Sequence, residues 1–314
     1  MTEPIVVSYS ELDAYRQCPL KHLWAYKERW KKPPAPGSPL SRGSLWHDVL
    51  EVHYLRLMEL WEDKRINVNT NPHDKELIQE VVAEARAQLF DPDSGEYVSE
   101  DAELIDWMYE GHVEWYGLEP EWTPVAVEYP FQIPLLDEDG EPSDYHIKGK
   151  IDVILRHNAT GLLWVVDHKS AANLAGQQDL EIDDQFGLYV WAMRQLGHRI
   201  VGSIHSAARS KRNTADYPGY KGKLKPQTLE SRFKRTLLNR SEEETDAVAY
   251  DAYATAVNAY PEPGRELPLY SAPNPRQCGW KCDFKEIHLM TRQGVDAKGA
   301  LQDSGFIQDF TRHN

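Results

Sequence analysis

The chain has 314 residues, of which 41% are hydrophobic and 11% aromatic, and this composition predicts a folded protein with a real core and excludes a largely disordered one. Fifty acidic against 35 basic residues give a formal net charge of −15, which excludes coating of nucleic acid by global charge but leaves room for a local basic channel. With no apolar run near the roughly 20 residues of a membrane span, and no signal-peptide pattern at the N-terminus, we expect a soluble, cytoplasmic protein.

The first 120 residues are expected to be mainly helical. Ser8 or Ser10 can cap a first helix, because a hydroxyl accepts hydrogen bonds from the free amides at a helix start. A Pro-rich stretch at 31–40 cannot be regular helix. Apolar residues then recur at helical spacing over 44–65, 73–90 and 99–118. We therefore expect residues 1–120 to form a helical N-terminal region.

From residue 123 the pattern alternates as strands do. The stretches 123–137, 144–157 and 161–171 are expected strands, and the last two should pair as a hairpin across the turn at 158–161. A helix at 182–197, a strand at 198–209 and a helix at 242–259 follow. This order predicts a mixed α/β core over 121–260, followed by a cysteine-bearing segment, 261–314.

The third of these strands ends on three ionisable residues, Asp167, His168 and Lys169. Alternation places Asp167 and Lys169 on one face and His168 on the other, and the partner strand can bring Asp152 beside Asp167. Two adjacent carboxylates repel unless a cation lies between them, and Mg²⁺ with water ligands suits such a site. Lys169 could then orient or deprotonate a water molecule. The competing interpretation is a salt-bridged hairpin, Asp167 with Lys169 or Lys150, and the triplet alone favours it.

Two further pairs of residues change this balance. Gln185 and Tyr189 are four residues apart on the next helix and share one face. His47 follows Gly43 at the same spacing in an earlier helix. The ordered motifs are Gly43-x-x-x-His47, Gly149-x-x-Asp152, Asp167-x-Lys169 and Gln185-x-x-x-Tyr189.

This set of motifs resembles the RecB-type branch of the PD-(D/E)XK nuclease superfamily, over residues 8–288. That branch includes the nuclease domains of RecB and AddB, the CRISPR-associated RecB-like exonucleases and many phage exonucleases. The resemblance implies a restriction-endonuclease-like core, a mixed sheet flanked by helices. It also implies a site for Mg²⁺ or Mn²⁺ whose ligands are His47, Asp152, Asp167 and the backbone carbonyl of His168.

The resemblance assigns the remaining motif residues as well. Lys169 would position or activate the hydrolytic water. Gln185 and Tyr189 would brace the site and contact DNA. Glu128 is a further candidate, as an accessory acid, and the His168 side chain is expected to pack away from the metal.

A local basic segment runs over residues 209–235, with nine Lys or Arg against two acidic residues and three interleaved aromatics. It is either a solvated loop or a segment that follows phosphates and stacks on single-stranded bases. The candidate DNA-contacting residues, besides Tyr189, are Arg209, Lys211, Arg212, Lys221, Lys223 and Lys225.

The chain has three cysteines, too few for a disulfide framework in a reducing compartment. In the iron–sulfur members of the resembled branch, one cysteine lies in an N-terminal Cys-Pro segment and three lie near the C-terminus. The resemblance therefore implies that the segment 261–314 packs back on the N-terminus. Cys18, Cys278 and Cys282 match three of these positions, and His288 stands where a fourth ligand is expected. The resemblance implies a [4Fe-4S] cluster on these four residues. Zn²⁺ suits the same donors, and cysteines that merely pack are a third interpretation.

The sequence thus predicts a metal-dependent DNA nuclease, an exonuclease on single strands or DNA ends, acting in recombination, repair or phage DNA processing. It has no P-loop motif, so ATP-driven unwinding would need a helicase or recombinase partner. Two alternatives stay open. One is a non-catalytic DNA-binding accessory protein that keeps the nuclease fold, and the other is a zinc-stapled interaction protein.

Overall fold

The computed structural model describes residues 3–33, 37–265, 267–280 and 282–310. The chain divides into two compact units, each assembled from separate stretches of sequence. Unit 1 comprises Met1–Pro34, Gln132–Gly149 and Ala249–Asn314, and unit 2 comprises Ala35–Phe131 and Lys150–Val248. The three-part division expected from the sequence, with boundaries after residues 120 and 260, stays a prediction.

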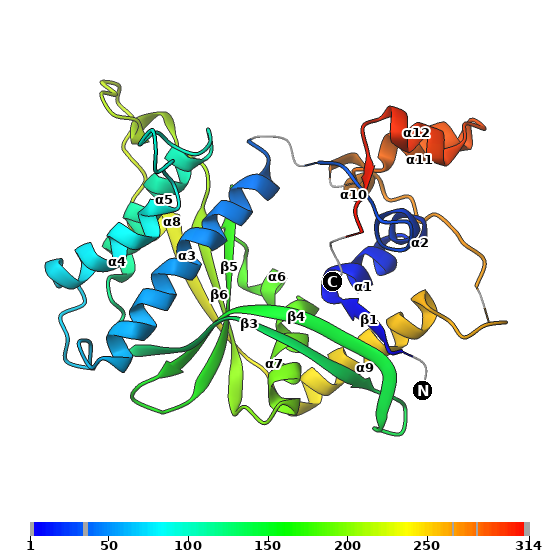
Figure 1. Ribbon diagram of the computed structural model, residues 1–314, viewed down its shortest axis with the longest axis horizontal. Helices are drawn as coiled ribbons and strands as arrows, with labels where there is room; N and C mark the ends of the chain where they lie inside the picture. The colour runs from blue at the N-terminus through cyan, green and yellow to red at the C-terminus, as the bar shows by residue number, and fades with distance from the viewer. Residues whose placement is uncertain (1–2, 34–36, 266, 281, 311–314) are drawn as a thin grey trace. The chain divides into compact units, whose positions relative to one another are not determined.

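Unit 2 contains most of a mixed sheet (Figure 1). Its strands are the second half of β4 (Pro142–His157), then β5 (Leu163–Ala171), β6 (Ile200–Arg209) and β7 (Phe233–Asn239), with β3 (Trp122–Leu136) also paired to β4. β4 and β5 are antiparallel, with Val153 opposite Val166, and this confirms the expected hairpin. β5 and β6 are parallel, and β6 and β7 antiparallel. The expected mixed α/β class is confirmed.

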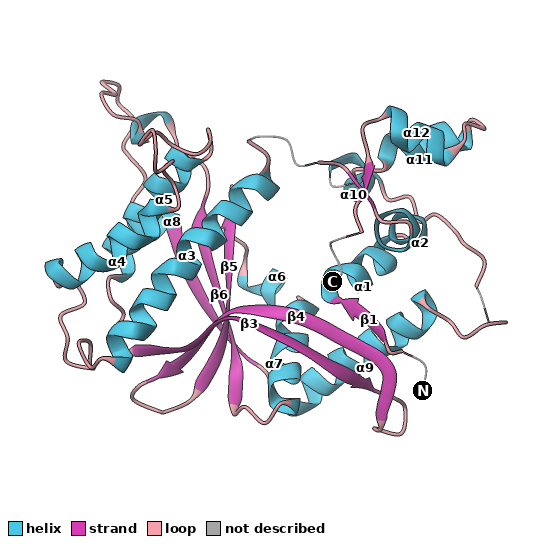
Figure 2. Ribbon diagram, in the orientation of Figure 1, coloured by secondary structure: helices cyan, strands magenta, loops and turns pink. Residues whose placement is uncertain are grey.

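Helices flank this sheet (Figure 2). On one face, α3 (Pro39–Glu62), α4 (Lys75–Ala87) and α5 (Ala102–Tyr116) share an apolar core with alternate strand residues, including Val153 and Val166. α7 (Asp184–Gln195) packs on β6, where the Phe186 ring meets the His205 ring edge-on. Asp167 follows Val166 on β5, so its side chain lies on the face opposite to that of Val166. His205 is paired with Asp167, so the contact of His205 with α7 lies on the same face as Asp167. The shorter elements are α6 (Gln177–Glu181), η2 (Thr214–Asp216) and α8 (Leu229–Arg232).

Unit 1 joins the two ends of the chain. β1 (Ile5–Ser8) runs parallel to the first half of β4, and β2 (Trp30–Lys31) pairs antiparallel with β8 (Ile307–Gln308). A small core gathers aromatic and aliphatic side chains from both ends, among them Trp24, Trp30, Phe284, Ile287 and Leu301. The helical elements are α1 (Tyr9–Gln17), α2 (Pro19–His22), η1 (Leu23–Lys27), the latter part of α9 (Glu242–Ala259), α10 (Pro275–Trp280), α11 (Lys285–Arg292) and α12 (Ala297–Asp303).

Two features differ from expectation. The strand β1 was not expected from the sequence. No strand or helix was expected in the basic segment 209–235 either, yet α8 and the start of β7 lie in it. The apolar residues of β7 are interrupted by Lys234 and Arg235, and this hides its strand pattern. None of the helices in the described part of the chain combines the length and apolar character that crossing a bilayer would require.

Candidate active site

The hairpin of β4 and β5 brings two carboxylates to one place. Asp152 and Asp167 flank the pair formed by Val153 and Val166, so they occupy neighbouring positions on adjacent strands. The His168 backbone N–H donates to Asp152 Oδ2 at 2.7 Å. Lys169 Nζ donates to Asp167 Oδ1 at 2.7 Å, while Asp167 Oδ2 is buried without a hydrogen-bond partner. The structure therefore contains both the salt bridge that the triplet suggests and a free carboxylate oxygen beside it.

A helix and a third strand complete the cluster. His47, on α3, lies with Nδ1 3.4 Å from Asp152 Oδ2. Ligand atoms of His47, Asp152 and Glu128, which lies on β3, are all within 4.8 Å of one another. Glu128 has φ +50°, a conformation that costs a non-glycine residue about 1 kcal/mol or more, and it also forms an ion pair with Lys150. Strain at an acid beside two candidate ligands favours a functional role for Glu128.

Burial dominates the electrostatics of the two aspartates. It raises the pKa of Asp167 to about 6, with the nearby Asp152 charge acting in the same direction and Lys169 against it. Burial alone would also raise the pKa of Asp152, but the hydrogen bond and charge of His47 and the backbone N–H of His168 lower it overall. Asp152 correspondingly raises the pKa of His47 against the effect of burial. The pair thus holds one readily ionised carboxylate and one that a cation would have to stabilise.

The two motif residues of α7, Gln185 and Tyr189, lie near the acids. Gln185 Nε2 donates to the Tyr189 hydroxyl at 3.1 Å, and the edge of the Tyr189 ring meets Phe131 with centroids 5.6 Å apart. Burial raises the pKa of Tyr189, and the charges of Asp167 and Lys169 also act on it. The two α7 residues therefore lie in the electrostatic neighbourhood of the acids and support each other.

His168 lies on the other face of β5, as alternation predicts. Its ring stacks on Tyr54 with centroids 5.2 Å apart, and burial lowers its pKa to about 3. The His168 side chain is therefore neutral packing, and only its backbone can reach the acids.

The donor set fits a hard divalent cation. Mg²⁺ and Mn²⁺ prefer oxygen ligands, and Mg²⁺ is usually held by one or two carboxylates with several water molecules. Asp152 and Glu128 supply carboxylates and His47 a ring nitrogen within 4.8 Å of one another. Asp167 is not in this group, and it lies beside Asp152 on the neighbouring strand. The buried Asp167 Oδ2 has no hydrogen-bond partner and so has a lone pair available to a cation, whereas a buried polar atom is normally satisfied.

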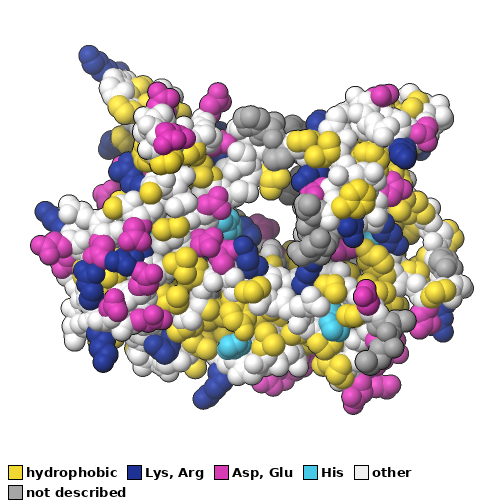
Figure 3. Space-filling model, viewed as in Figure 1, with side chains coloured by type: hydrophobic (Ala, Val, Ile, Leu, Met, Phe, Trp, Pro, Cys, Tyr) yellow, Lys and Arg dark blue, Asp and Glu magenta, His cyan; other side chains and the backbone are white. Residues whose placement is uncertain are grey.

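The basic residues of the 209–235 segment are not equivalent. Lys211, Lys221, Lys223 and Lys225 are exposed. Arg212 is instead largely buried, pairs with Glu103 and lies over the Trp107 ring. Arg209 donates from Nε to the Ala172 carbonyl. On the face shown in Figure 3, acidic and basic side chains are interspersed. Acidic residues outnumber basic ones in the sequence, which gives the chain its negative net charge.

The three cysteines and His288 meet in unit 1. They line one cavity of about 170 Å³, together with apolar side chains including Trp24 and Phe284. The Ala272 N–H points at Cys18 Sγ at 3.4 Å, and the Asn274 N–H points at Cys278 Sγ at 3.3 Å. Burial raises the pKa of Cys282. All three cysteines are free thiols and none is fully buried.

The raised pKa of Asp167 predicts a pH-dependent stability difference. Without metal, folded Asp167 binds its proton more tightly than the unfolded chain, so this contribution is present below about pH 4 and lost as pH rises through 6. Asp167→Asn removes it. The free energy of unfolding of the variant, relative to wild type, should rise by about 1–3 kcal/mol between pH 4 and 7 in urea titrations with chelator. A difference independent of pH would contradict the raised pKa.

Comparisons with known proteins identify the family of the chain. A family model described as the PD-(D/E)XK nuclease superfamily matches residues 6–287. No curated protein matches the chain. Among solved structures, the crystal structure of SSO0001 has 13% identity to this chain and a TM-score of 0.38. The match covers 91% of this chain and 87% of the SSO0001 chain. A protein from Eubacterium rectale described as a candidate exonuclease has 9% identity and a TM-score of 0.40. The match covers 89% of this chain and 93% of the Eubacterium rectale chain. With the family model spanning most of its length, the chain belongs to the PD-(D/E)XK nuclease superfamily.

Proposed function

We propose that the protein is a metal-dependent DNA nuclease of the RecB-like branch, acting as an exonuclease on single strands or DNA ends in recombination, repair or phage DNA processing. The observation that carries this proposal is the buried Asp167 carboxylate, with one free oxygen, held between Asp152 and Lys169. An isolated salt bridge would not need a second buried acid at its side. A metal-dependent hydrolase does.

Each residue then has a chemical task. His47, Asp152, Asp167 and the His168 carbonyl would hold Mg²⁺ or Mn²⁺, which when bound supplies Lewis-acid stabilisation of charge on the phosphate and activates water. Asp167 raises the pKa of Lys169 against the effect of burial. Lys169 therefore carries its proton at neutral pH, which favours orienting water and stabilising phosphate charge over acting as a base. Gln185 and Tyr189 would brace this arrangement and contact the DNA.

Substrate binding is assigned to the basic segment. The exposed lysines at 211, 221, 223 and 225 can follow a phosphate backbone, and the exposed Tyr217 offers a ring for base stacking. Arg209 and Arg212 would contribute mainly by holding the segment in shape, because both already make protein contacts. A helicase or recombinase partner would supply single strands.

A [4Fe-4S] cluster is proposed at Cys18, Cys278, Cys282 and His288, with zinc as the alternative. Two thiolates on one zinc ion lie at most about 4.6 Å apart, since each Zn–S bond is about 2.3 Å. Among the described residues, neither of the two groups with ligand atoms within 4.8 Å contains a cysteine. Residues spread around a 170 Å³ cavity suit a multinuclear cluster better than a single ion.

The nuclease proposal predicts loss of activity on substitution at the hairpin. Asp167→Asn and Lys169→Met should each lower the rate of digestion of end-labelled single-stranded DNA, with Mg²⁺ or Mn²⁺, by at least about 100-fold. Asp63→Asn, an exposed acid at the end of α3, is the matched control and should retain activity.

Two results would count against this assignment. Activity that survives in both hairpin variants would refute the site. An inactive wild-type protein that still binds DNA would favour the accessory protein that keeps only the fold.

The cluster proposal predicts iron in the protein. Anaerobically purified protein should be brown, contain iron and acid-labile sulfide in about equal amounts, and lose both in Cys282→Ser. Asp167→Asn should keep its iron, because its site lies in the other unit. A colourless protein whose Cys282→Ser variant contains one equivalent less zinc than wild type would favour the zinc alternative, and a metal content unchanged in Cys282→Ser would show that the cysteines only pack.

A further inference from the structure

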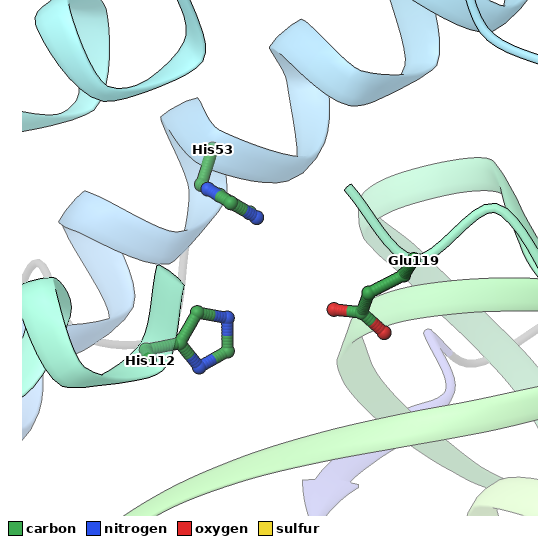
Figure 4. Close-up of side chains that lie close together, drawn as sticks. All are labelled: His53, His112 and Glu119. Atoms are coloured by element: carbon green, nitrogen blue, oxygen red, sulfur yellow. The ribbon is translucent and has the colours of Figure 1, made fainter. Parts of the chain in front are cut away.

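A second group of potential ligands lies buried in unit 2, apart from the carboxylate site. It consists of His53 on α3, His112 on α5 and Glu119 in the segment between α5 and β3. One ligand atom from each lies within 4.8 Å of the other two, and all three residues are at most 2% exposed. Figure 4 shows the two rings and the carboxylate turned toward one another from three different parts of the chain.

Both imidazoles carry an unsatisfied ring nitrogen. His53 Nε2 and His112 Nε2 are buried and have no hydrogen-bond partner. Leaving a buried polar atom unpaired costs about 1–3 kcal/mol, so two such atoms facing one carboxylate need an explanation. Burial lowers the pKa of both histidines, which keeps the rings neutral and able to donate a lone pair.

Neighbouring groups hold the histidine in the orientation that a ligand needs. His53 Nδ1 and the Tyr109 hydroxyl are 2.9 Å apart. When Nδ1–H donates to this hydroxyl, the lone pair lies on Nε2, the nitrogen without a partner. Hydrogen bonding of the distal nitrogen is the usual way in which proteins orient a metal-binding histidine.

Hydrogen bonds likewise hold the Glu119 carboxylate in place, but they do not use all of its lone-pair positions. Oε1 of Glu119 accepts from the Tyr54 hydroxyl at 3.0 Å and from Arg235 Nη2 at 2.9 Å, and Oε2 accepts from Arg235 Nη1. A carboxylate offers about four lone-pair positions, so one remains. Glu119 also has φ +49°, so its backbone is held in an unfavourable conformation at this position.

We propose that His53, His112 and Glu119 bind a structural transition-metal dication of the zinc class. Two nitrogens and one carboxylate oxygen are a common zinc donor set, with water available for a fourth position. The Arg235 guanidinium on the same carboxylate weakens the attraction for any dication. The imidazoles must therefore supply much of the bonding, which selects against Mg²⁺.

Such an ion would tie α3 and α5 to the segment before β3. Tyr54, which donates to Glu119, also stacks on His168 in β5. The ion would thus stiffen the helices packed behind the strand that carries Asp167 and Lys169. Binding is independent of the nuclease activity and of the cysteine site in unit 1.

The test is the metal content of the full-length protein. After purification, chelation and reloading with Zn²⁺, His112→Gln and His53→Gln should each contain one molar equivalent less zinc than wild type. His205→Gln, which removes a buried histidine outside the group, should contain the same amount as wild type. Zn²⁺ should raise the melting temperature of the stripped His205→Gln protein by more than that of the stripped His112→Gln protein.

Co²⁺ gives an independent readout that needs no substitution at the histidines. Cobalt-loaded protein that combines Cys18→Ser, Cys278→Ser, Cys282→Ser and Asp152→Asn should still show ligand-field absorption, without sulfur-to-metal charge transfer. If the histidine variants do not fold, Glu119→Gln, of nearly the same shape, replaces them in the zinc measurement. Equal zinc content in wild type and in the variants, or no cobalt absorption in the combined cysteine and Asp152 variant, would overturn the proposal.

Discussion

The antiparallel register of β4 and β5 is the constraint on which the proposed chemistry depends. It sets Val153 opposite Val166 and thereby brings Asp152 and Asp167 together at the edge of an apolar core. Two carboxylates in this position are unfavourable, since burial and mutual repulsion act against the second charge. The hairpin supplies the packing energy that keeps them there. A one-residue slip of β5 would turn Asp167 away from Asp152 and into the core shared with α3 and α5, so the register is strongly specified.

β5 serves two different environments with alternate residues. On one face, Asp167 and Lys169 lie among the ionised groups and the side chains of α7. On the other, Val166 and His168 pack toward α3 and α5. The buried polar groups on this second face reach from His168 through Tyr54 to Glu119. A change in the packing of these helices can therefore alter the strand that carries the acids, without touching the substrate.

Local patterns predicted the hairpin, the main helices and the residues that converge on the acids. The hairpin was predictable because its two strands are adjacent in the chain and are separated by a short turn at 158–161. α9 was predicted with its observed bounds, since its helical spacing is uninterrupted. The acids, His47 and the α7 pair followed from ordered short motifs, each weak alone.

Long-range polar contacts were not predictable in this way. From its position in a basic segment, Arg235 would be expected at the surface. It is instead largely buried against Glu119, which lies 116 residues earlier in the sequence. The burial of Arg235 is decided by its partner Glu119 and not by its neighbours in sequence. Arg235 also interrupts the apolar pattern of β7, so that strand was not predicted. His53 and His112 lie on two different helices, where neither belongs to a short motif, and only the fold brings them to Glu119. Glu128 could be suspected from its strand, but its strained backbone is visible only in the structure.

The central claim is that the buried acids of the hairpin exist to hold a catalytic divalent cation. Calorimetric titration of the metal-free protein with Mn²⁺ tests it most directly, because it measures binding without requiring turnover. The account predicts that Asp152→Asn and Asp167→Asn each lose one Mn²⁺ site that wild type and Asp63→Asn retain. Unchanged Mn²⁺ binding in both hairpin variants would contradict it.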